Sequence, residues 1–219
     1  MIPSFPVYLF DVDGTLLDSA ADTCGAIRGA LAVTRASAAS DNLLRQYIGR
    51  HLIDLFQYLL PDEYSRDQLE ALVANYRRIY LGRGHSATHR YPGVAEALAS
   101  LPGRKSTATT KGTPTTRAVL EQFELLSYFD HVQGTDGFPA KPEPDVILRS
   151  LEVFGVDRRD CLLVGDSAAD MEAGRRAGVR TCAVLWGYGQ REELAHWEPD
   201  YWVSEPSELA SSSRLSLPV

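Results

Sequence analysis

The sequence PVYLFDVDGT, residues 6–15, decides the fold, because a short apolar run ends directly in two closely spaced carboxylates. The run from Pro6 to Phe10 is short and continuously apolar, which is typical of a strand buried on both faces of a parallel sheet. Asp11 and Asp13 follow this predicted strand at its carboxyl end. Aspartate and glycine are also common turn residues, but two carboxylates this close repel each other unless a cation or a proton lies between them. The motif therefore indicates a site for a cation.

A second acidic pair lies far along the chain, in the sequence VGDSAAD, residues 164–170. The apolar run from Cys161 to Val164 predicts another buried strand, and Asp166 and Asp170 follow its carboxyl end. An aspartate or serine here could do no more than cap the helix that follows. Two acidic clusters, each at the end of a predicted strand, favour a shared site instead. Oxygen-only ligands favour a hard cation, and beside a phosphate group they would suggest magnesium (Mg2+).

From Pro92 onward, predicted helices and strands alternate along the chain. This alternation predicts a parallel sheet with helices on both faces, and ligands of such sheets bind at the carboxyl ends of the strands. The predicted helices are residues 94–101, a helix opened by the Thr113-Pro114 pair, 145–154 and 168–177, and the predicted strands are 106–109, 131–133, 161–164 and 181–185.

Between Ala20 and Arg83 the pattern predicts helices only. The first of four predicted helices follows a cap at Asp18 or Ser19. The other three start near Asp41, Leu52 and Arg66. Together the four form a small bundle inserted after the first strand. We therefore expect an α/β fold with a Rossmann-like parallel-sheet core, residues 1–17 and 88–219, and an inserted helical bundle, residues 18–87.

Two polar features could bind a phosphate group. Thr109 and Thr110 follow the predicted strand at 106–109 and offer hydroxyl and backbone N–H donors. Lys141 precedes a proline-rich turn, which would hold it on a stiff backbone, although an ordinary surface lysine is the simpler interpretation when it is taken alone. The residues before Thr109, 105–108, are more polar than a buried parallel strand should be, and the sequence offers no reason for this.

Composition narrows the class of protein. The chain has 219 residues, of which 44% are apolar, enough for a well-filled core. Its formal net charge of −7 argues against a nucleic-acid partner, since such proteins carry basic surfaces. The three cysteines lack metal or redox spacing, and free buried thiols favour a reducing cytoplasm. With no signal peptide and no apolar run of membrane-spanning length, we expect a cytoplasmic protein without a membrane partner.

The motifs D-x-D-G-T, a strand-end threonine, K-P-x-P and G-D-S-x-x-D occur here in the order that resembles the haloacid dehalogenase superfamily. Within it the chain is most similar to phosphoglycolate phosphatases, through residues 11–19, 91–94 and 164–178. The helical insert resembles the cap domain of that group. The resemblance covers nearly the whole chain and implies a Mg2+-dependent phosphatase that acts on a small phosphorylated metabolite.

The resemblance also implies roles for the acidic residues. Asp11 would be the nucleophile that forms an aspartyl-phosphate, and Asp13 would protonate the leaving alcohol and then activate water. Asp11, Asp166 and the backbone carbonyl of Asp13 would hold magnesium, with Asp170 orienting the ligands of the metal or binding it directly. Dehalogenation is disfavoured, because a leaving halide needs no proton and Asp13 fits an alkoxide.

Phosphate binding is assigned by the same resemblance. Thr109 and Lys141 would hold the phosphoryl oxygens and stabilise their charge in the transition state. Thr110 is the alternative to Thr109. We prefer Thr109, because Lys111 then lies two positions after the threonine, where relatives often carry a lysine. Arg50 and His51, just after Gly49, are candidates for binding a substrate carboxylate, although both could be surface residues. Trp186, Tyr188 and Trp197 are predicted to be packing residues.

Other functions share parts of this pattern. A sugar-phosphate mutase uses the same motifs but returns the phosphoryl group to its substrate, and a pyrophosphatase or nucleotidase is a further alternative. A receiver-like signalling domain also has an acidic cluster, a phospho-accepting aspartate, a threonine and a lysine, but its acidic pair comes first and no helical insert follows. A catalytically inactive interaction protein would not need the intact acidic set. The sequence fixes neither the substrate nor the oligomeric state.

Overall fold

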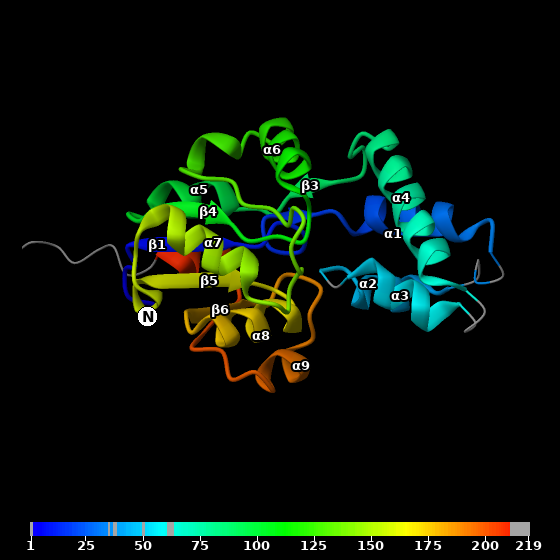
Figure 1. Ribbon diagram of the computed structural model, residues 1–219. Helices are drawn as coiled ribbons and strands as arrows, with labels where there is room; N and C mark the ends of the chain where they lie inside the picture. The colour runs from blue at the N-terminus through cyan, green and yellow to red at the C-terminus, as the bar shows by residue number, and fades with distance from the viewer. Residues whose placement is uncertain (1, 35, 37–38, 50, 61–63, 211–219) are drawn as a thin grey trace, which may run out of the picture.

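The computed structural model describes residues 2–34, 36, 39–49, 51–60 and 64–210. Figure 1 shows two parts side by side: a sheet with helices around it, and a group of helices beyond one end of the sheet. The sheet has five strands in the order β4-β1-β5-β6-β7, and every pairing in it is parallel. Its strands are β1 Val7–Phe10, β4 Arg104–Thr107, β5 Cys161–Gly165, β6 Arg180–Val184 and β7 Tyr201–Val203.

The central strands β1 and β5 are buried along their whole length. This explains why their sequences are continuous apolar runs, since a strand covered on both faces has no polar side. Phe10 pairs with Thr107 on one side and with Val164 on the other. The three strands therefore end at the same edge of the sheet, and residues that follow each of them are brought together there.

Helices cover both faces of the sheet. One face packs against α5, Val94–Ser100, and α6, Thr113–Gln122, and the other against α7, Asp145–Phe154, and α8, Ala168–Ala177. Alternate residues of β1 enter the two layers: Tyr8 and Phe10 lie in the first and Val7 and Leu9 in the second. The short helix α9, Arg191–Ala195, follows β6. This arrangement confirms the expected α/β class.

The remaining helices form a separate bundle, here called the cap: α1 Ala20–Leu31, α2 Asp41–Gln46, α3 Leu52–Leu59 and α4 Arg66–Gly82. The cap has its own hydrophobic core, which includes Ile27, Leu44, Phe56 and Tyr76. Figure 1 shows it beyond the edge of the sheet where β1 and β5 end. This core is separate from those of the sheet, although Tyr188 of the sheet domain packs against it.

Two chain crossings join the cap to the sheet domain. Leu17–Asp18, β2, pairs antiparallel with His89–Arg90, β3, so the crossings run side by side. The buried carboxylate of Asp22 in α1 accepts hydrogen bonds from Arg83 Nε at 2.9 Å, Ala87 N at 2.9 Å and Thr88 Oγ1 at 2.8 Å. Asp22 therefore fixes the returning crossing to the first cap helix. The exact boundaries of the two domains stay a prediction.

Replacing Asp22 by alanine should lower the free energy of unfolding of the cap by about 2–4 kcal/mol, because three donors lose a buried acceptor. Burial works against ionisation of Asp22, but its hydrogen bonds to Thr88, Ala87 and Arg83 lower its pKa. The stabilisation is therefore present above the ordinary aspartate pKa and is lost as the pH falls through the lowered folded value. Urea denaturation followed by circular dichroism measures both effects.

The matched control is Asp41→Ala, which removes the exposed ion pair with Arg28 in the same bundle. Exposed pairs contribute about 1 kcal/mol or less, so this variant should unfold close to the natural chain. Equal destabilisation by Asp22→Ala and Asp41→Ala would contradict the role given to Asp22.

The polarity of β4 has a structural reason. β4 lies at the edge of the sheet, and its polar side chains have partners outside the ladder. Lys105 Nζ donates to the carbonyls of Leu101 and Gly103, both at 2.8 Å, and Ser106 Oγ lies 2.9 Å from His131 Nδ1. Buried polar groups are tolerated when they are hydrogen-bonded. The strand ends at Thr107, two residues earlier than predicted.

The predicted strand at residues 131–133 is wrong, because this segment has no ladder pairing. The hydroxyl of Thr107 takes the place of a backbone partner: it donates to the carbonyl of Gln133 and accepts from its N–H, both at 2.9 Å. A side chain that satisfies the backbone in this way competes with sheet pairing.

The helix boundaries in the sheet domain are close to those predicted. α7 and α8 have the predicted bounds, and α8 ends at Gly178, which has a φ of 76°. The helix that Thr113-Pro114 was predicted to open is α6, but Gly112 and not Thr113 occupies its cap position, and Thr113 Oγ1 accepts from Gly134 N at 2.9 Å. In the part of the chain that the structure describes, no helix is both long and apolar enough to cross a membrane.

Candidate active site

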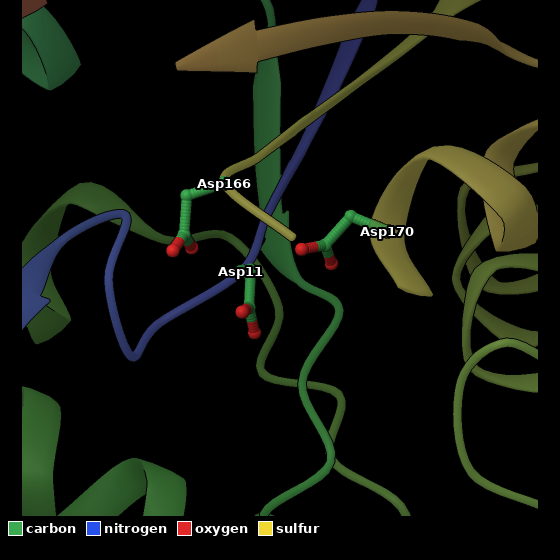
Figure 2. Close-up of side chains that lie close together, drawn as sticks. All are labelled: Asp11, Asp166 and Asp170. Atoms are coloured by element: carbon green, nitrogen blue, oxygen red, sulfur yellow. The ribbon is translucent and has the colours of Figure 1, made fainter. Parts of the chain in front are cut away.

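Three carboxylates converge at the shared edge of β1 and β5. Oxygens of Asp11, Asp166 and Asp170 lie within 4.8 Å of one another, and all three residues are buried. Figure 2 shows the side chains pointing into one space from the end of β1, the turn after β5 and the first turn of α8. Members of both predicted acidic pairs are thus brought together, Asp11 from the first and Asp166 with Asp170 from the second. No histidine or cysteine belongs to this group, so it offers oxygen ligands only.

The electrostatics of this cluster fit a divalent metal ion. Burial raises the pKa of Asp11 to about 6, although Lys141 beside it acts in the opposite direction. Burial and the neighbouring Asp170 and Asp11 also raise the pKa of Asp166. Three carboxylates with one ammonium leave two negative charges uncompensated when all are ionised. A divalent cation bound by the carboxylate oxygens would remove this repulsion.

Lys141 is fully buried and lies between two of the carboxylates. Its Nζ is 2.9 Å from Asp11 Oδ1 and 2.5 Å from Asp170 Oδ1. Burial lowers the pKa of this amine, but the two carboxylates outweigh burial and raise it above its usual range. Lys141 therefore stays a cation, and its position excludes the interpretation as a surface lysine.

Neighbouring residues hold Asp166 in place. Thr15 Oγ1 donates to Asp166 Oδ1 at 2.9 Å, and the backbone N–H of Tyr188 donates to Oδ2 at 2.8 Å. Gly14 has a φ of 87°, and a Cβ at this position would clash with the Asp166 carboxylate. The glycine of the first motif is therefore required by both its backbone angle and the close approach of the second motif.

Asp170 also has a structural role. Its carboxylate accepts from Ser167 N at 3.0 Å and Ser167 Oγ at 2.5 Å, and its own N–H donates back to Ser167 Oγ at 3.3 Å. These contacts form a capping box at the start of α8. The carboxylate of Asp170 therefore both caps α8 and belongs to the acidic group, so the two interpretations of this stretch are both correct.

Asp13 is not a member of the group of three carboxylates. It lines a cavity of about 520 Å³ between the cap and the sheet domain, which Asp11, Asp166 and Asp170 do not line. Ser19 Oγ donates to Asp13 Oδ1 at 2.5 Å, and Lys111 Nζ forms an ion pair with Oδ2. Burial tends to raise the pKa of Asp13, but Lys111 and the Ser19 hydroxyl outweigh it and lower the pKa.

The two candidate threonines differ in position. Thr109 is buried, its Oγ1 accepts from Lys111 N at 3.4 Å, and its carbonyl accepts from Thr135 Oγ1 at 2.9 Å. Thr110 is half-buried and lines the cavity. Both follow β4 at the edge where the carboxylates meet. Which hydroxyl binds a phosphoryl group stays a prediction.

The predicted cap residues have separate outcomes. Arg50 lies outside the described residues. His51 is exposed at the start of α3, where its Nδ1 accepts from Ile53 N at 3.4 Å, and it lines the cavity. The helix α2 ends at Gln46, three residues before Gly49.

Two contacts of the site were missed from the sequence. Ser19 was predicted as a possible helix cap, but its hydroxyl donates to Asp13 and makes no capping bond. Tyr188 was predicted to be a packing residue, yet its hydroxyl accepts from Ser19 N at 2.7 Å and donates to Asp18 Oδ1 at 3.0 Å. Tyr188 thus contacts both Asp166 and the first crossing to the cap. No local pattern could show this, because Ser19 and Tyr188 are 169 positions apart.

Known proteins are similar to this chain in sequence and in fold. A family model described as haloacid dehalogenase-like hydrolase matches residues 8–184. A phosphoglycolate phosphatase of Aquifex aeolicus is 34% identical over 207 residues, covering 93% of this chain and 94% of the relative. A phosphoglycolate phosphatase of Vibrio parahaemolyticus is 33% identical over 210 residues, covering 91% and 92%. The solved structure of a haloacid dehalogenase-like hydrolase from Streptococcus pneumoniae has a TM-score of 0.84 at 26% identity, covering 94% of this chain and 97% of that one.

Proposed function

Because the chain belongs to the haloacid dehalogenase-like hydrolase family and is a phosphatase like the relatives above, we propose that it hydrolyses 2-phosphoglycolate with magnesium and an aspartyl-phosphate on Asp11. The observation that carries the mechanism is the buried group of Asp11, Asp166 and Asp170 with Lys141 beside it. A carboxylate nucleophile and a phosphate ester repel each other, and this group can hold the cations that remove the repulsion.

Asp11 and Asp166 would hold magnesium together with the backbone carbonyl of Asp13. Asp170 would orient these ligands or bind the metal directly. When bound, magnesium supplies positive charge between the nucleophile and the phosphoryl oxygens. Lys141 supplies a second, permanent positive charge and favours the ionised form of Asp11, because their atoms are 2.9 Å apart. Lys141 and Thr109, or its neighbour Thr110, would bind the phosphoryl oxygens as negative charge spreads over them.

The reaction then has two steps. In the first, Asp13 takes up a proton from solvent, a carboxylate oxygen of Asp11 attacks phosphorus, the bond to the ester oxygen breaks, and Asp13 gives that proton to the ester oxygen. In the second, Asp13 takes a proton from water, whose oxygen attacks phosphorus and releases phosphate from Asp11. Asp13 suits both steps because it lines the cavity where the leaving alcohol and water would lie.

The substrate is proposed from the names of the two similar phosphatases, both called phosphoglycolate phosphatase. Buried free thiols at Cys24, Cys161 and Cys182 suit a reducing compartment, so we place the reaction in the cytoplasm. The partner is a small phosphorylated metabolite, and neither nucleic acid nor a membrane is proposed to take part.

The test is phosphate release from a panel of phosphate monoesters, pyrophosphate and nucleotides, with magnesium or with excess chelator. We expect 2-phosphoglycolate to be hydrolysed with the highest kcat/KM. Activity with magnesium should exceed that with chelator by at least about 100-fold and should return when magnesium is restored. Full activity in chelator would contradict the metal requirement, and transfer of phosphate to a sugar without release would favour a mutase.

A further inference from the structure

The proposed mechanism gives no role to Lys111, which lies between the proposed acid, Asp13, and the cap. Lys111 lines the cavity, and its side chain is only 11% exposed. Its Nζ pairs with Asp13 Oδ2 and lies 4.8 Å from the centre of the Tyr80 ring of α4. This one side chain, from the loop after β4, therefore contacts both the proposed acid and the wall of the cap.

The surroundings of Lys111 keep it charged and leave it a free donor. Burial alone would lower the pKa of this amine, but Asp13 and the two tyrosines Tyr80 and Tyr76 outweigh burial and raise it. An ammonium group has three N–H donors. One is used by Asp13 and a second faces the Tyr80 ring, which leaves a donor for a ligand in the cavity.

An unpaired polar atom lies in the same wall. The Tyr80 hydroxyl is buried and has no hydrogen-bond partner within the described part of the chain, and Tyr80 lines the cavity. Unpaired buried polar atoms are rare in folded proteins. The unpaired hydroxyl therefore adds a polar group to the cap wall beside Lys111.

We propose that Lys111 is a specificity-determining residue, which binds a carboxylate on the leaving group of the substrate and so selects phosphate esters with an acidic group close to the ester oxygen. The proposal deepens the proposed function and rests on it for the position of the ester.

The geometry follows from Asp13. If Asp13 protonates the ester oxygen, that oxygen lies against the Asp13 carboxylate, and Lys111 is bound to the same carboxylate. In a 2-phosphorylated hydroxy acid, one carbon separates the ester oxygen from the carboxylate carbon. The carboxylate then lies within reach of Lys111, whereas a neutral leaving group offers it no anionic partner.

Another cation in the described lining of the cavity is Arg77 of α4, which is exposed. An exposed cation contributes little to binding because water screens and solvates it. Lys111 is nearly buried, so a carboxylate that loses this partner stays in a poorly solvated place without compensation.

The main test compares Lys111→Met with the natural chain on 2-phosphoglycolate and on 2-hydroxyethyl phosphate, a neutral ester of similar size. The ratio of the two kcat/KM values should fall roughly 10- to 100-fold, since one charge-assisted hydrogen bond is lost for the acidic ester alone. Lys111 also contacts Asp13, so kcat for both esters can decrease together without changing this ratio. Lys111→Arg keeps the charge and should retain most of the preference.

Two controls separate Lys111 from general charge effects. Arg78→Met removes an exposed charge from α4 outside the cavity, and it should leave the ratio unchanged. Arg77→Met removes the exposed charge inside the cavity and should change the ratio far less than Lys111→Met. A larger effect from Arg77→Met, or an equal fractional loss for both esters in Lys111→Met, would overturn the proposal.

A binding measurement distinguishes this proposal from the proposed function, because it needs no turnover. Calorimetry with magnesium compares 3-phosphonopropionate, which carries the carboxylate, with propylphosphonate, which does not. The natural chain should prefer the first, and Lys111→Met should remove most of that preference. If this holds but neither ester is hydrolysed, the proposed function fails and the role of Lys111 stands. If the variant keeps the preference, the role of Lys111 fails, whatever the chain hydrolyses. If Lys111→Met does not fold, Lys111→Gln serves in both measurements with the same outcomes.

Discussion

Replacing Asp11 by asparagine should lower the turnover of every phosphate ester by at least about 10⁴-fold. Asparagine keeps the shape of the side chain, but its amide is neither a nucleophile for phosphorus nor an anionic metal ligand. The loss should be independent of the leaving group, because no substrate can bypass the first covalent step. Steady-state phosphate release in saturating magnesium measures it.

The matched control is Asp160→Asn, which changes an exposed aspartate just before β5 in the same way. This variant should keep the turnover of the natural chain. An Asp11→Asn variant that folds normally and retains more than about a hundredth of the natural turnover would rule out Asp11 as the nucleophile.

Replacing Asp13 by asparagine should have the second-largest effect, and this effect should depend on the leaving group. With an alkyl ester such as 2-phosphoglycolate, the first step should slow by about 10²–10⁴-fold, because the alkoxide must leave without a proton. With 4-nitrophenyl phosphate the first step should slow far less, since nitrophenolate is stable without protonation. Hydrolysis of the aspartyl-phosphate should slow for both esters.

The measurement is a rapid-mixing experiment with 4-nitrophenyl phosphate. Asp13→Asn should give a burst of nitrophenol followed by a slow steady phase, because the aspartyl-phosphate forms but hydrolyses slowly. An equal slowing of the first step for alkyl and nitrophenyl esters would contradict the role of Asp13 as the acid.

The strands and helices beside the site could be predicted where the local sequence alone decides them. β1 and β5 are continuous apolar runs because both faces of each are covered, and α8 ends where Gly178 adopts a positive φ. The residues that follow these elements could therefore be placed at one edge of the sheet. The meeting of Asp11 with Asp166 follows from parallel strands whose carboxyl ends align.

Other features depend on partners far away in the chain and left no local pattern. The polar strand β4 made sense only when its edge position and the partners of Lys105 were known. The missing strand at residues 131–133 reflects a single hydroxyl, that of Thr107, which replaces a backbone partner. Lys111 and Asp13 are 98 positions apart, so their pairing could not be predicted from either motif.

Burying the acidic cluster costs stability that the fold must offset elsewhere. Buried ionic groups are often replaceable by apolar residues with a gain in stability. Lys141→Met should nevertheless abolish the proposed phosphate contact and also lower the stability of the fold, because it leaves the buried Asp11 and Asp170 without their shared cation. Retaining Lys141 at this position makes sense if the site must bind an anion.

The most direct measurement of the central claim is chemical trapping of phosphate on Asp11. Asp13→Asn, mixed with 4-nitrophenyl phosphate and magnesium, is quenched and reduced with borohydride, which converts an aspartyl-phosphate to homoserine. Mass spectrometry of the peptide that contains residues 7–15 should find homoserine at position 11, and only when substrate and magnesium were present. Nitrophenol release with no homoserine at position 11, or with homoserine at another aspartate, would contradict the proposed mechanism.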